Sequence, residues 1–363
     1  MSNTKTVMSQ AANTQGIPLD ITDVFSTYLW AGNNGSQTIT NGIDLLNEGG
    51  LVWFKNRTTG NLEHKLVDTE RGLVGGGSGP ANAYYLQSDT TNAQGDRAWA
   101  WSFLENGFSF NKDYTDINAT GEDYASWTFR KAPKFFDVVT YTGTGSAQNI
   151  SHNLGSVPGV VIVKDISGSG NSWTVYHRSA GNTGGLLLND TNAFITSTTF
   201  FNDTTPTDTQ FTVGTATNVN QSGRSFVAYL FAHNDGDGGF GPDGDQDIIK
   251  CGSYTGNGSY SGPSVDLGFE PQWVMIKRAT GGNAPWMILD NMRGLVVGDG
   301  DKAIEANNSN QEGYGILALA PTATGFDLEV DSNAFNRNGE TYIYIAIRRG
   351  PLAPPESATE VFA

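Results

Sequence analysis

"YTGTGSAQNISHNLGSVPGVVIVK" (residues 141–164) and "YTGNGSYSGPSVDLGFEPQWVMIK" (residues 254–277) are two copies of one stretch, and they start 113 positions apart. Both copies open with a Tyr-Thr-Gly turn, carry a Leu-Gly pair and a proline in the middle, and end in an apolar run closed by lysine. Trp173 and Trp286 lie at the same spacing. The spacing is that of an ordinary domain rather than of a short solenoid unit, so each copy is expected to have its own core.

A looser third copy precedes these two. It starts at Tyr28 with "YLWAGNNGSQTITNGIDLLNEGGLVWFK", and it shares the pattern D-x-x-R-G-L-V, at residues 68–74 and 290–296, with the last copy. The middle copy has only the weaker "YHRSAG" there. The sequence thus predicts an amino-terminal arm, two modules, an acidic linker, a third module and a Pro-rich carboxyl-terminal arm, with boundaries at 1–22, 23–133, 134–234, 235–248, 249–350 and 351–363.

The apolar pattern within each copy is that of β-structure. Runs such as "VVIVK", "FVAYLF" and "IYIAI" are short and rich in Val, Ile, Tyr and Phe, and they are separated by clusters of Gly, Asn, Asp, Ser and Thr. No long segment has the spacing of an amphipathic helix. We therefore predict an all-β protein of three tandem, diverged β-sandwich modules, jelly-roll-like, with polar terminal arms.

Composition narrows the function classes. The formal charge of −16 and the pI near 4.5 argue against nucleic acid as a partner, because its phosphates would be repelled. The sequence contains no run of 18 apolar residues, so no membrane-spanning helix is predicted. The polar amino terminus lacks the apolar region of a signal peptide. Cys251 is the lone cysteine, so no intramolecular disulfide can form and a packing role in a reducing cytoplasm is expected.

Motifs for catalysis are missing from the sequence. It contains no G-x-S-x-G, P-loop or H-E-x-x-H motif, and its four histidines (His64, His152, His177 and His233) are scattered. The 37 acidic residues could form a glycosidase-like pair in space without leaving a spacing signal. Nothing in the sequence supports a polysaccharide depolymerase, and we expect a protein that is not an enzyme. We expect no cofactor, with Ca²⁺ at the acidic segment described next as the one candidate ion.

One acidic, Gly-rich segment, "HNDGDGGFGPDGDQDIIK", lies between the second and third modules. Oxygen ligands on a flexible loop are what Ca²⁺ prefers, although the order does not match an EF-hand. The alternative is a solvated linker rich in turn-forming residues. The candidate metal ligands are Asp235, Asp237, Asp243, Asp245 and Asp247.

The D-x-x-R-G motif has two interpretations. Each aspartate could pair with its arginine and hold the following glycine in a turn, or the charged pair could bind sugar hydroxyls beside exposed aromatic rings. Recurrence of the motif in diverged modules favours the structural role. The candidate binding residues are Asp68, Arg71, Asp290 and Arg293, with Tyr84, Tyr85, Trp99 and Trp101 either as sugar-stacking rings or as core and interface residues.

Several long phrases carry a family resemblance. "TITNGIDLLNEGGLVWFKNR", "HKLVDTERG", "LFAHNDGDGGFGPDGDQDIIKCGSYTGNGS" and "DLGFEPQWVMIKR" resemble an uncharacterised repeat family common in virion proteins of marine bacteriophages, including cyanophages. The resemblance spans roughly residues 20–350 and implies a bacteriophage structural protein, of the kind called tail-fibre-like or simply virion protein. No catalytic residues are assigned in that family, and many of its proteins are longer.

The residues and the resemblance lead to one functional expectation. We expect a virion structural protein, assembled in the bacterial host cytoplasm, that serves as a tail fibre or tail-associated component in host attachment. A capsid decoration, a head fibre or a glycan-binding module is the alternative. The expected partners are other virion proteins, further copies of the chain in a homo-oligomer with a trimer favoured, and a host surface glycan.

Overall fold

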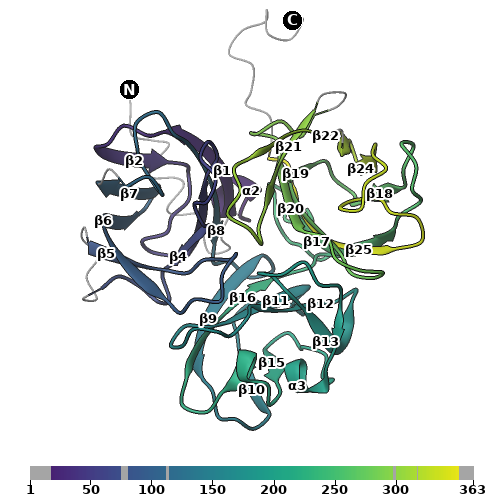
Figure 1. Ribbon diagram of the computed structural model, residues 1–363, viewed down its shortest axis with the longest axis horizontal. Coiled ribbons are helices and arrows are strands. Elements are labelled where there is room, and N and C mark those ends of the chain that lie inside the picture. Colours follow the sequence, from purple (N-terminus) through teal and green to yellow (C-terminus); the bar gives the residue numbers. More distant parts are fainter. Residues whose placement is uncertain (1–17, 75–80, 112–113, 297–299, 317, 351–363) are drawn as a thin grey trace, which may run out of the picture.

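The computed structural model describes residues 18–74, 81–111, 114–296, 300–316 and 318–350. Within these ranges the protein is all-β, with six antiparallel sheets in three sandwich-like modules, which confirms the predicted fold class. Figure 1 shows the modules as three lobes around a common centre. The terminal arms lie largely outside the described residues, at 1–17 and 351–363.

Module 1 pairs two four-stranded sheets. Their strand orders are β1-β8-β3-β4, nearest the centre, and β2-β7-β6-β5. The elements are α2 (Ile21–Val24), β1 (Phe25–Ala31), β2 (Ser36–Thr40), β3 (Gly50–Asn56), β4 (Lys65–Asp68), β5 (Ala81–Tyr85), β6 (Gly95–Leu104), β7 (Gly107–Asn111) and β8 (Asp123–Arg130).

Module 2 has a six-stranded sheet, β14-β13-β12-β11-β16-β9, and a two-stranded sheet, β10-β15. Its elements are β9 (Phe136–Thr142), β10 (Gln148–Ser151), β11 (Val160–Asp165), β12 (Thr174–His177), β13 (Gly181–Leu187), β14 (Ile195–Thr196), α3 (Thr198–Phe201), β15 (Gln210–Val213), α4 (Thr217–Asn220) and β16 (Ser225–Phe231).

Module 3 has the sheets β17-β25-β19-β20-β21-β22 and β18-β24-β23. Its elements are β17 (Ile249–Thr255), β18 (Ser264–Asp266), β19 (Pro271–Arg278), β20 (Trp286–Asp290), β21 (Asp301–Glu305), β22 (Gly313–Ile316), β23 (Leu319–Thr322), β24 (Gly325–Leu328) and β25 (Thr341–Arg348). The same four-strand order therefore recurs three times, as β1-β8-β3-β4, β9-β16-β11-β12 and β17-β25-β19-β20.

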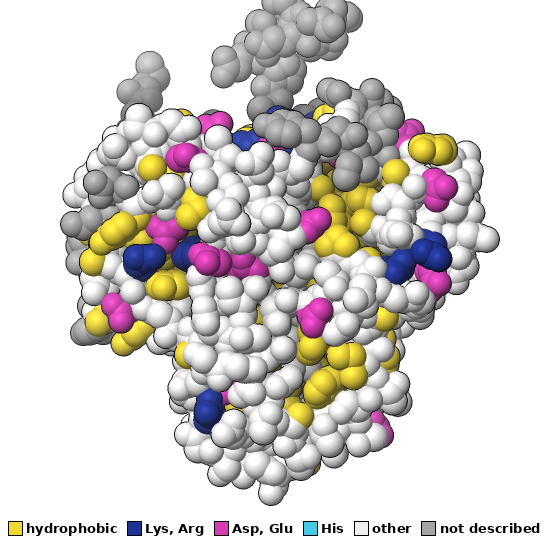
Figure 2. All heavy atoms as spheres, in the orientation of Figure 1, with side chains coloured by type: hydrophobic (Ala, Val, Ile, Leu, Met, Phe, Trp, Pro, Cys, Tyr) yellow, Lys and Arg dark blue, Asp and Glu magenta, His cyan; other side chains and the backbone are white. Residues whose placement is uncertain are grey.

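The three recurring sheets pack against one another at the centre of the molecule. Phe129 of module 1 packs edge-on against Phe231 of module 2, with ring centroids 5.3 Å apart, and against Trp273 of module 3 at 5.8 Å. One continuous apolar cluster joins buried side chains from all three modules. Figure 2 shows apolar side chains where lobes meet and also on the lobes themselves, with charged side chains scattered among them.

This packing explains why the strand sequences are runs rather than alternations. In β19, Trp273 and Met275 face the centre, whereas Val274 and Ile276 face the interior of module 3. A strand with both faces buried needs apolar side chains at odd and even positions alike. The runs that identified the repeat are thus the strands shared by a module core and the central core.

The repeated glycine turn is held by a buried asparagine. Asn220 accepts a hydrogen bond from the backbone N–H of Thr144 and donates to the carbonyl oxygens of Ser146 and Gly214. Asn118 and Asn336 hold the corresponding turns of modules 1 and 3. By this equivalence Trp30, rather than Tyr28, is the module 1 counterpart of the tyrosines that open the other turns, since it stacks on Tyr124 as they stack on β16 and β25.

The glycine of that turn leaves no room for a side chain. A Cβ at Gly143 would lie 2.3 Å from the carbonyl oxygen of Gln221. The equivalent distance is 2.0 Å at Gly32 and 2.3 Å at Gly256, again to backbone oxygens. Only glycine allows the turn to approach the loop that carries the asparagine, which accounts for the recurrence of the motif.

We expect Gly143→Ala to lower the free energy of unfolding by about 1–3 kcal/mol, because the backbone must shift to admit the methyl group. Urea unfolding followed by far-UV circular dichroism measures it. Gly60→Ala is the matched control, since a Cβ there would meet its nearest neighbour at an ordinary 3.7 Å. Equal stabilities of the two variants would contradict the steric account of the turn.

Candidate functional site

A buried lysine at the same repeat position joins each module to the next. The Nζ atom of Lys164 donates to the carbonyl oxygen of Thr91 in module 1 at 3.1 Å, and that of Lys277 donates to Thr191 in module 2 at 2.8 Å. Lys55 of module 1 makes the longer corresponding contact, 3.5 Å, to Ser309 of module 3. The contacts run 2 to 1, 3 to 2 and 1 to 3, so they close a ring.

A second set of bonds repeats the same pattern. The indole N–H groups of Trp173 and Trp286 each donate to a carbonyl of the neighbouring module, Gln87 and Leu187 respectively, at 2.9 Å. In module 1 the position is occupied by His64, whose Nε2 lies 3.1 Å from the carbonyl oxygen of Glu305. Because the indole N–H of Trp53 donates to Nδ1 of His64, Nε2 carries the proton and donates.

A third set consists of backbone hydrogen bonds from the same loops. Their donors lie seven residues after Gln87, Leu187 and Glu305, whose carbonyl oxygens accept the second set. The N–H groups of Gln94, Phe194 and Glu312 donate across the seams to the carbonyl oxygens of Ile166, Ala279 and Arg57, at 3.1, 2.9 and 3.0 Å. Every seam therefore contains the same three contacts in the same direction. The chain is a closed pseudo-threefold ring, in which one head-to-tail interface recurs three times.

The D-x-x-R-G motif lies at these seams. Asp68 accepts from the backbone N–H and the Nε of Arg71, at 2.8 and 2.5 Å, and from the hydroxyl of Tyr229 in module 2 at 2.7 Å. Both side chains of the pair are almost fully buried. The motif thus locks its own turn and binds the neighbouring module, so neither charge is exposed to solvent.

Module 3 uses its copy in the same way. Asp290 pairs with Arg293 and accepts from the indole N–H of Trp127 in module 1 at 2.9 Å. Arg293 also donates to Glu312, which forms a two-bond contact with Arg57 of module 1. The structure therefore places all four predicted motif residues inside inter-module contacts.

Module 2 has His177 where the other modules have the aspartate. Nδ1 of His177 accepts from the N–H of Ser179, so Nε2 donates to the carbonyl oxygen of Tyr344 in module 3 at 3.1 Å. Ile345 occupies the position that Tyr229 and Trp127 hold in the other modules. Where the acceptor carboxylate is missing, its side-chain donor is missing as well, so the substitution leaves neither His177 nor Ile345 with an unpaired polar atom at this position.

Burial shifts the pKa values of the seam groups toward their neutral forms. Burial lowers the pKa of Lys277 to about 7 and the pKa values of Lys55 and Lys164 to about 8. It also lowers the pKa of His177 to about 4 and that of His64 well below its usual value. The histidines are therefore neutral at pH 7, as their accepting Nδ1 atoms require.

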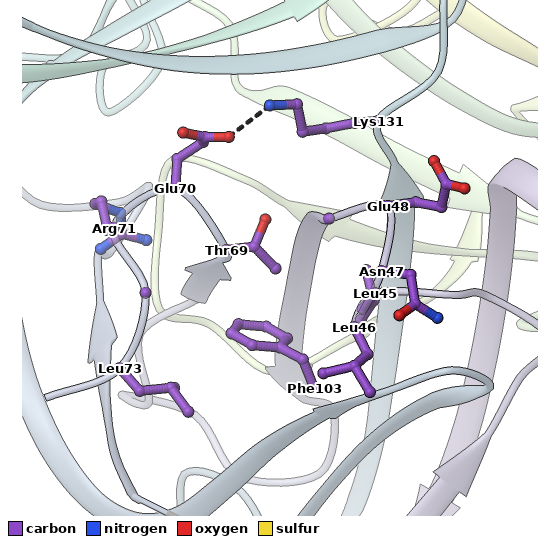
Figure 3. A pocket seen from close by; sticks show the side chains of 12 residues that line it. Leu45, Leu46, Asn47, Glu48, Thr69, Glu70, Arg71, Leu73, Phe103 and Lys131 are labelled. Carbon is purple, nitrogen blue, oxygen red and sulfur yellow. Dashed lines mark hydrogen bonds and ion pairs between the residues drawn. The ribbon is translucent and has the colours of Figure 1, made fainter. Parts of the chain in front are cut away.

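A surface pocket of about 500 Å³ adjoins the module 1 motif (Figure 3). Phe103 and the leucines of the lining form its apolar floor, and Glu48, Glu70 and Lys131 stand at its rim. Lys131 Nζ contacts a carboxylate oxygen of Glu70 at 2.5 Å. The pocket could hold a small polar molecule with one apolar face.

The acidic segment does not gather its carboxylates around one point. Asp247 accepts from the backbone N–H groups of Gly236 and Gly238, and Lys250 lies 3.2 Å from Asp235. In the described part of the chain, which includes all five predicted ligands, no three His, Cys, Asp or Glu side chains are placed to hold a metal ion. The segment instead forms a turn-rich loop closed by the Phe240–Gln246 bridge.

The predicted aromatic candidates separate into two groups. Trp99 and Trp101 are fully buried in the core of module 1, as the core interpretation expected. Tyr84 and Tyr85 are partly exposed on β5. The sequence patterns did not reveal the structural roles of the seam lysines and of His64. The recurrence of a lysine at the end of each quoted repeat was the one pattern that pointed to a shared role.

The three-module ring defines a class of all-β protein in which one chain builds its own pseudo-trimer. A family model described as a domain of unknown function, DUF7483, matches residues 20–351, and the chain belongs to this family. No curated protein matches the chain. The described helices are all too short to cross a membrane.

The seam lysines make stability depend on pH. A lysine whose pKa is lowered in the folded state binds fewer protons there than in the unfolded chain, so the unfolding free energy rises as pH increases from about 7 toward the ordinary lysine pKa of 10.5. Lys277→Met should flatten this rise. Urea unfolding at closely spaced pH values measures the slope, and an unchanged slope in Lys277→Met would contradict the assignment.

The hydroxyl of Tyr229 should contribute to the seam between modules 1 and 2. We expect Tyr229→Phe to lower the unfolding free energy by about 1–2 kcal/mol, because buried Asp68 loses one of its donors. A double-mutant cycle with Asp68→Asn isolates the pair. Additive effects of the two substitutions would show that the contact does not couple the modules.

Proposed function

We propose that this chain is a structural component of a bacteriophage virion, in a tail-fibre or tail-associated position that contributes to host attachment. The observation that carries the proposal is the closed ring, in which every seam repeats the same lysine, indole or imidazole, and backbone contacts. Such a ring is a rigid body that presents loops at fixed separations. That property suits an assembly part, and loop tips on rigid scaffolds are where recognition occurs.

The use of the charged groups supports the same proposal. The buried pairs Asp68–Arg71 and Asp290–Arg293 take part in contacts between modules, and so do the buried His64 and His177. An enzyme would be expected to keep perturbed groups of this kind in an open cleft. The resemblance of the long sequence phrases to phage virion proteins supplies the biological setting, with assembly in the bacterial cytoplasm.

A capsid decoration is the second candidate, and pseudo-threefold symmetry favours it. A single chain that repeats its fold three times around one axis fits a threefold position on a larger particle without forming a homotrimer. Light scattering distinguishes the possibilities for the free protein. A mass near 38.8 kDa supports the single-chain ring as the assembling unit, and a stable threefold multiple supports a fibre-like homotrimer.

The virion proposal predicts that the chain is found on particles. Phage particles are purified on a density gradient from infected cells in which the phage genome encodes the chain. The chain is then quantified by mass spectrometry against the major capsid protein. We expect a constant copy number through the particle peak, and gold-labelled antibody on the tail. Label on the head would favour decoration, and recovery of the chain only in the soluble fraction would refute both positions.

A further inference from the structure

Module 1 carries a cluster of tyrosine, carboxylate and guanidinium groups that the ring contacts do not use. We propose that Tyr85, Arg97, Tyr114 and Asp116 form a subsite for one neutral sugar residue of a host-surface glycan. This inference rests on the proposed role in host attachment and names the chemistry that module 1 recognises.

The four side chains come from three segments and converge on Asp116. Nη2 of Arg97 lies 3.6 Å from an oxygen of Asp116, and the guanidinium lies over the ring of Tyr114, 5.3 Å from its centroid. The ring of Tyr85 packs on Trp99, with centroids 5.4 Å apart, and Lys65 lies over it at 5.4 Å. Lys65 connects this ring to the carboxylate, because its Nζ also lies 4.0 Å from an oxygen of Asp116.

Asp116 has unused hydrogen-bonding capacity. Its side chain is only 7 % exposed, yet neither of its oxygens accepts a hydrogen bond from the described residues. The nearest cations, on Lys65 and Arg97, are at 4.0 and 3.6 Å, which exceeds hydrogen-bond distance. A buried carboxylate without donors is costly, and a pair of sugar hydroxyls would supply them.

Arg97 is the movable part of the cluster. Its side chain is 45 % exposed, so it can leave the face of Tyr114 at small cost. A pyranose ring that replaces it would place its C–H face on Tyr114 and its hydroxyls toward Asp116 and the hydroxyl of Tyr85. The displaced guanidinium would then donate to an outward hydroxyl.

The charge balance selects a neutral sugar. Lys65 and Arg97 contribute two positive charges, and their ion-pair partners Glu63 and Asp116 contribute two negative ones. The cluster therefore has no net positive charge to attract an acidic sugar, whose carboxylate would also lie close to that of Asp116. Hydroxyl donors are what the cluster can bind without cost.

The internal repeat supplies a control for this interpretation. The positions equivalent to Tyr85 are Gly185 and Ala303, and those equivalent to Asp116 are Asn218 and Ala334. The cluster is thus absent from modules 2 and 3, which fold to the same strand order without it. Tyr85 and Tyr114 also pack against the core of module 1, so the feature of the cluster that core packing does not explain is the carboxylate of Asp116 without hydrogen-bond donors among the described residues.

The test measures sugar binding by the full chain. Saturation-transfer NMR and calorimetric titration are run with methyl glycosides of glucose, galactose and mannose, and with methyl glucuronide as the acidic probe. We expect at least one neutral glycoside to bind, with at least tenfold weaker binding in Asp116→Asn and in Tyr114→Ala. Asp243→Asn, in the exposed acidic loop, is the matched charge control and should bind normally.

Thermal unfolding checks that each variant is folded, and Arg97→Gln, at an exposed position, serves if the other two are not. No binding of any neutral glycoside, binding of the glucuronide alone, or equal binding by wild type and all three cluster variants would overturn the subsite. The virion proposal has its own test. If particles contain the Asp116→Asn chain at the normal copy number but do not bind sugar, the chain keeps its structural role and the subsite is supported. If the wild-type chain is absent from particles, the structural role is refuted whatever the sugar result.

Discussion

The hydrogen bonds of the buried lysine amino groups at the seams are the interaction on which the rest of the structure depends. Each lysine lies on a central strand, and its Nζ donates to carbonyl oxygens, one of them in the neighbouring module. Removing such a group from water is costly unless its donors are satisfied. A module alone would leave the buried amino group without the acceptor that the neighbouring module supplies. The lysine therefore makes each module depend on its neighbour, and three such dependences in one direction can be satisfied together only by closing the ring.

Ring closure in turn determines what the central strands can contain. With the third seam formed, the outward faces of the three recurring sheets meet, and Phe129, Phe231 and Trp273 fill the space on the axis. A charged side chain or a row of water molecules there would be enclosed by apolar side chains, without contact with bulk solvent. This constraint produces the continuous apolar runs, and it differs from an isolated sandwich, whose outer face would alternate polar with apolar residues.

The period, the β character and the turns could be predicted because they are local. Gly143 and its counterparts repeat for a steric reason that operates within one module, and the sequence displays it directly. The seams could not be predicted, since each lysine finds a carbonyl oxygen in a loop whose side chains carry no signal. The identity of the donor also varies, with His64 standing where Trp173 and Trp286 stand. The D-x-x-R-G pair was correctly expected to lock its turn, but its bond to the next module depends on a residue more than a hundred positions away.

Divergence between the modules separates assembly from recognition. Positions that form the seams retain their function even when the residue changes, and the loss of the aspartate at His177 is matched by Ile345, which offers no donor to it. Positions away from the seams have no such restraint, and modules 2 and 3 have glycine or alanine where module 1 has Tyr85. A ring built from three unlike copies can therefore keep one assembly chemistry while each copy acquires its own surface. A homotrimer of identical modules could not do this, because any surface change would appear three times. Because the three modules belong to one chain, their surface residues can differ while their seams keep the same contacts. An asymmetric recognition surface is therefore compatible with a pseudo-symmetric core.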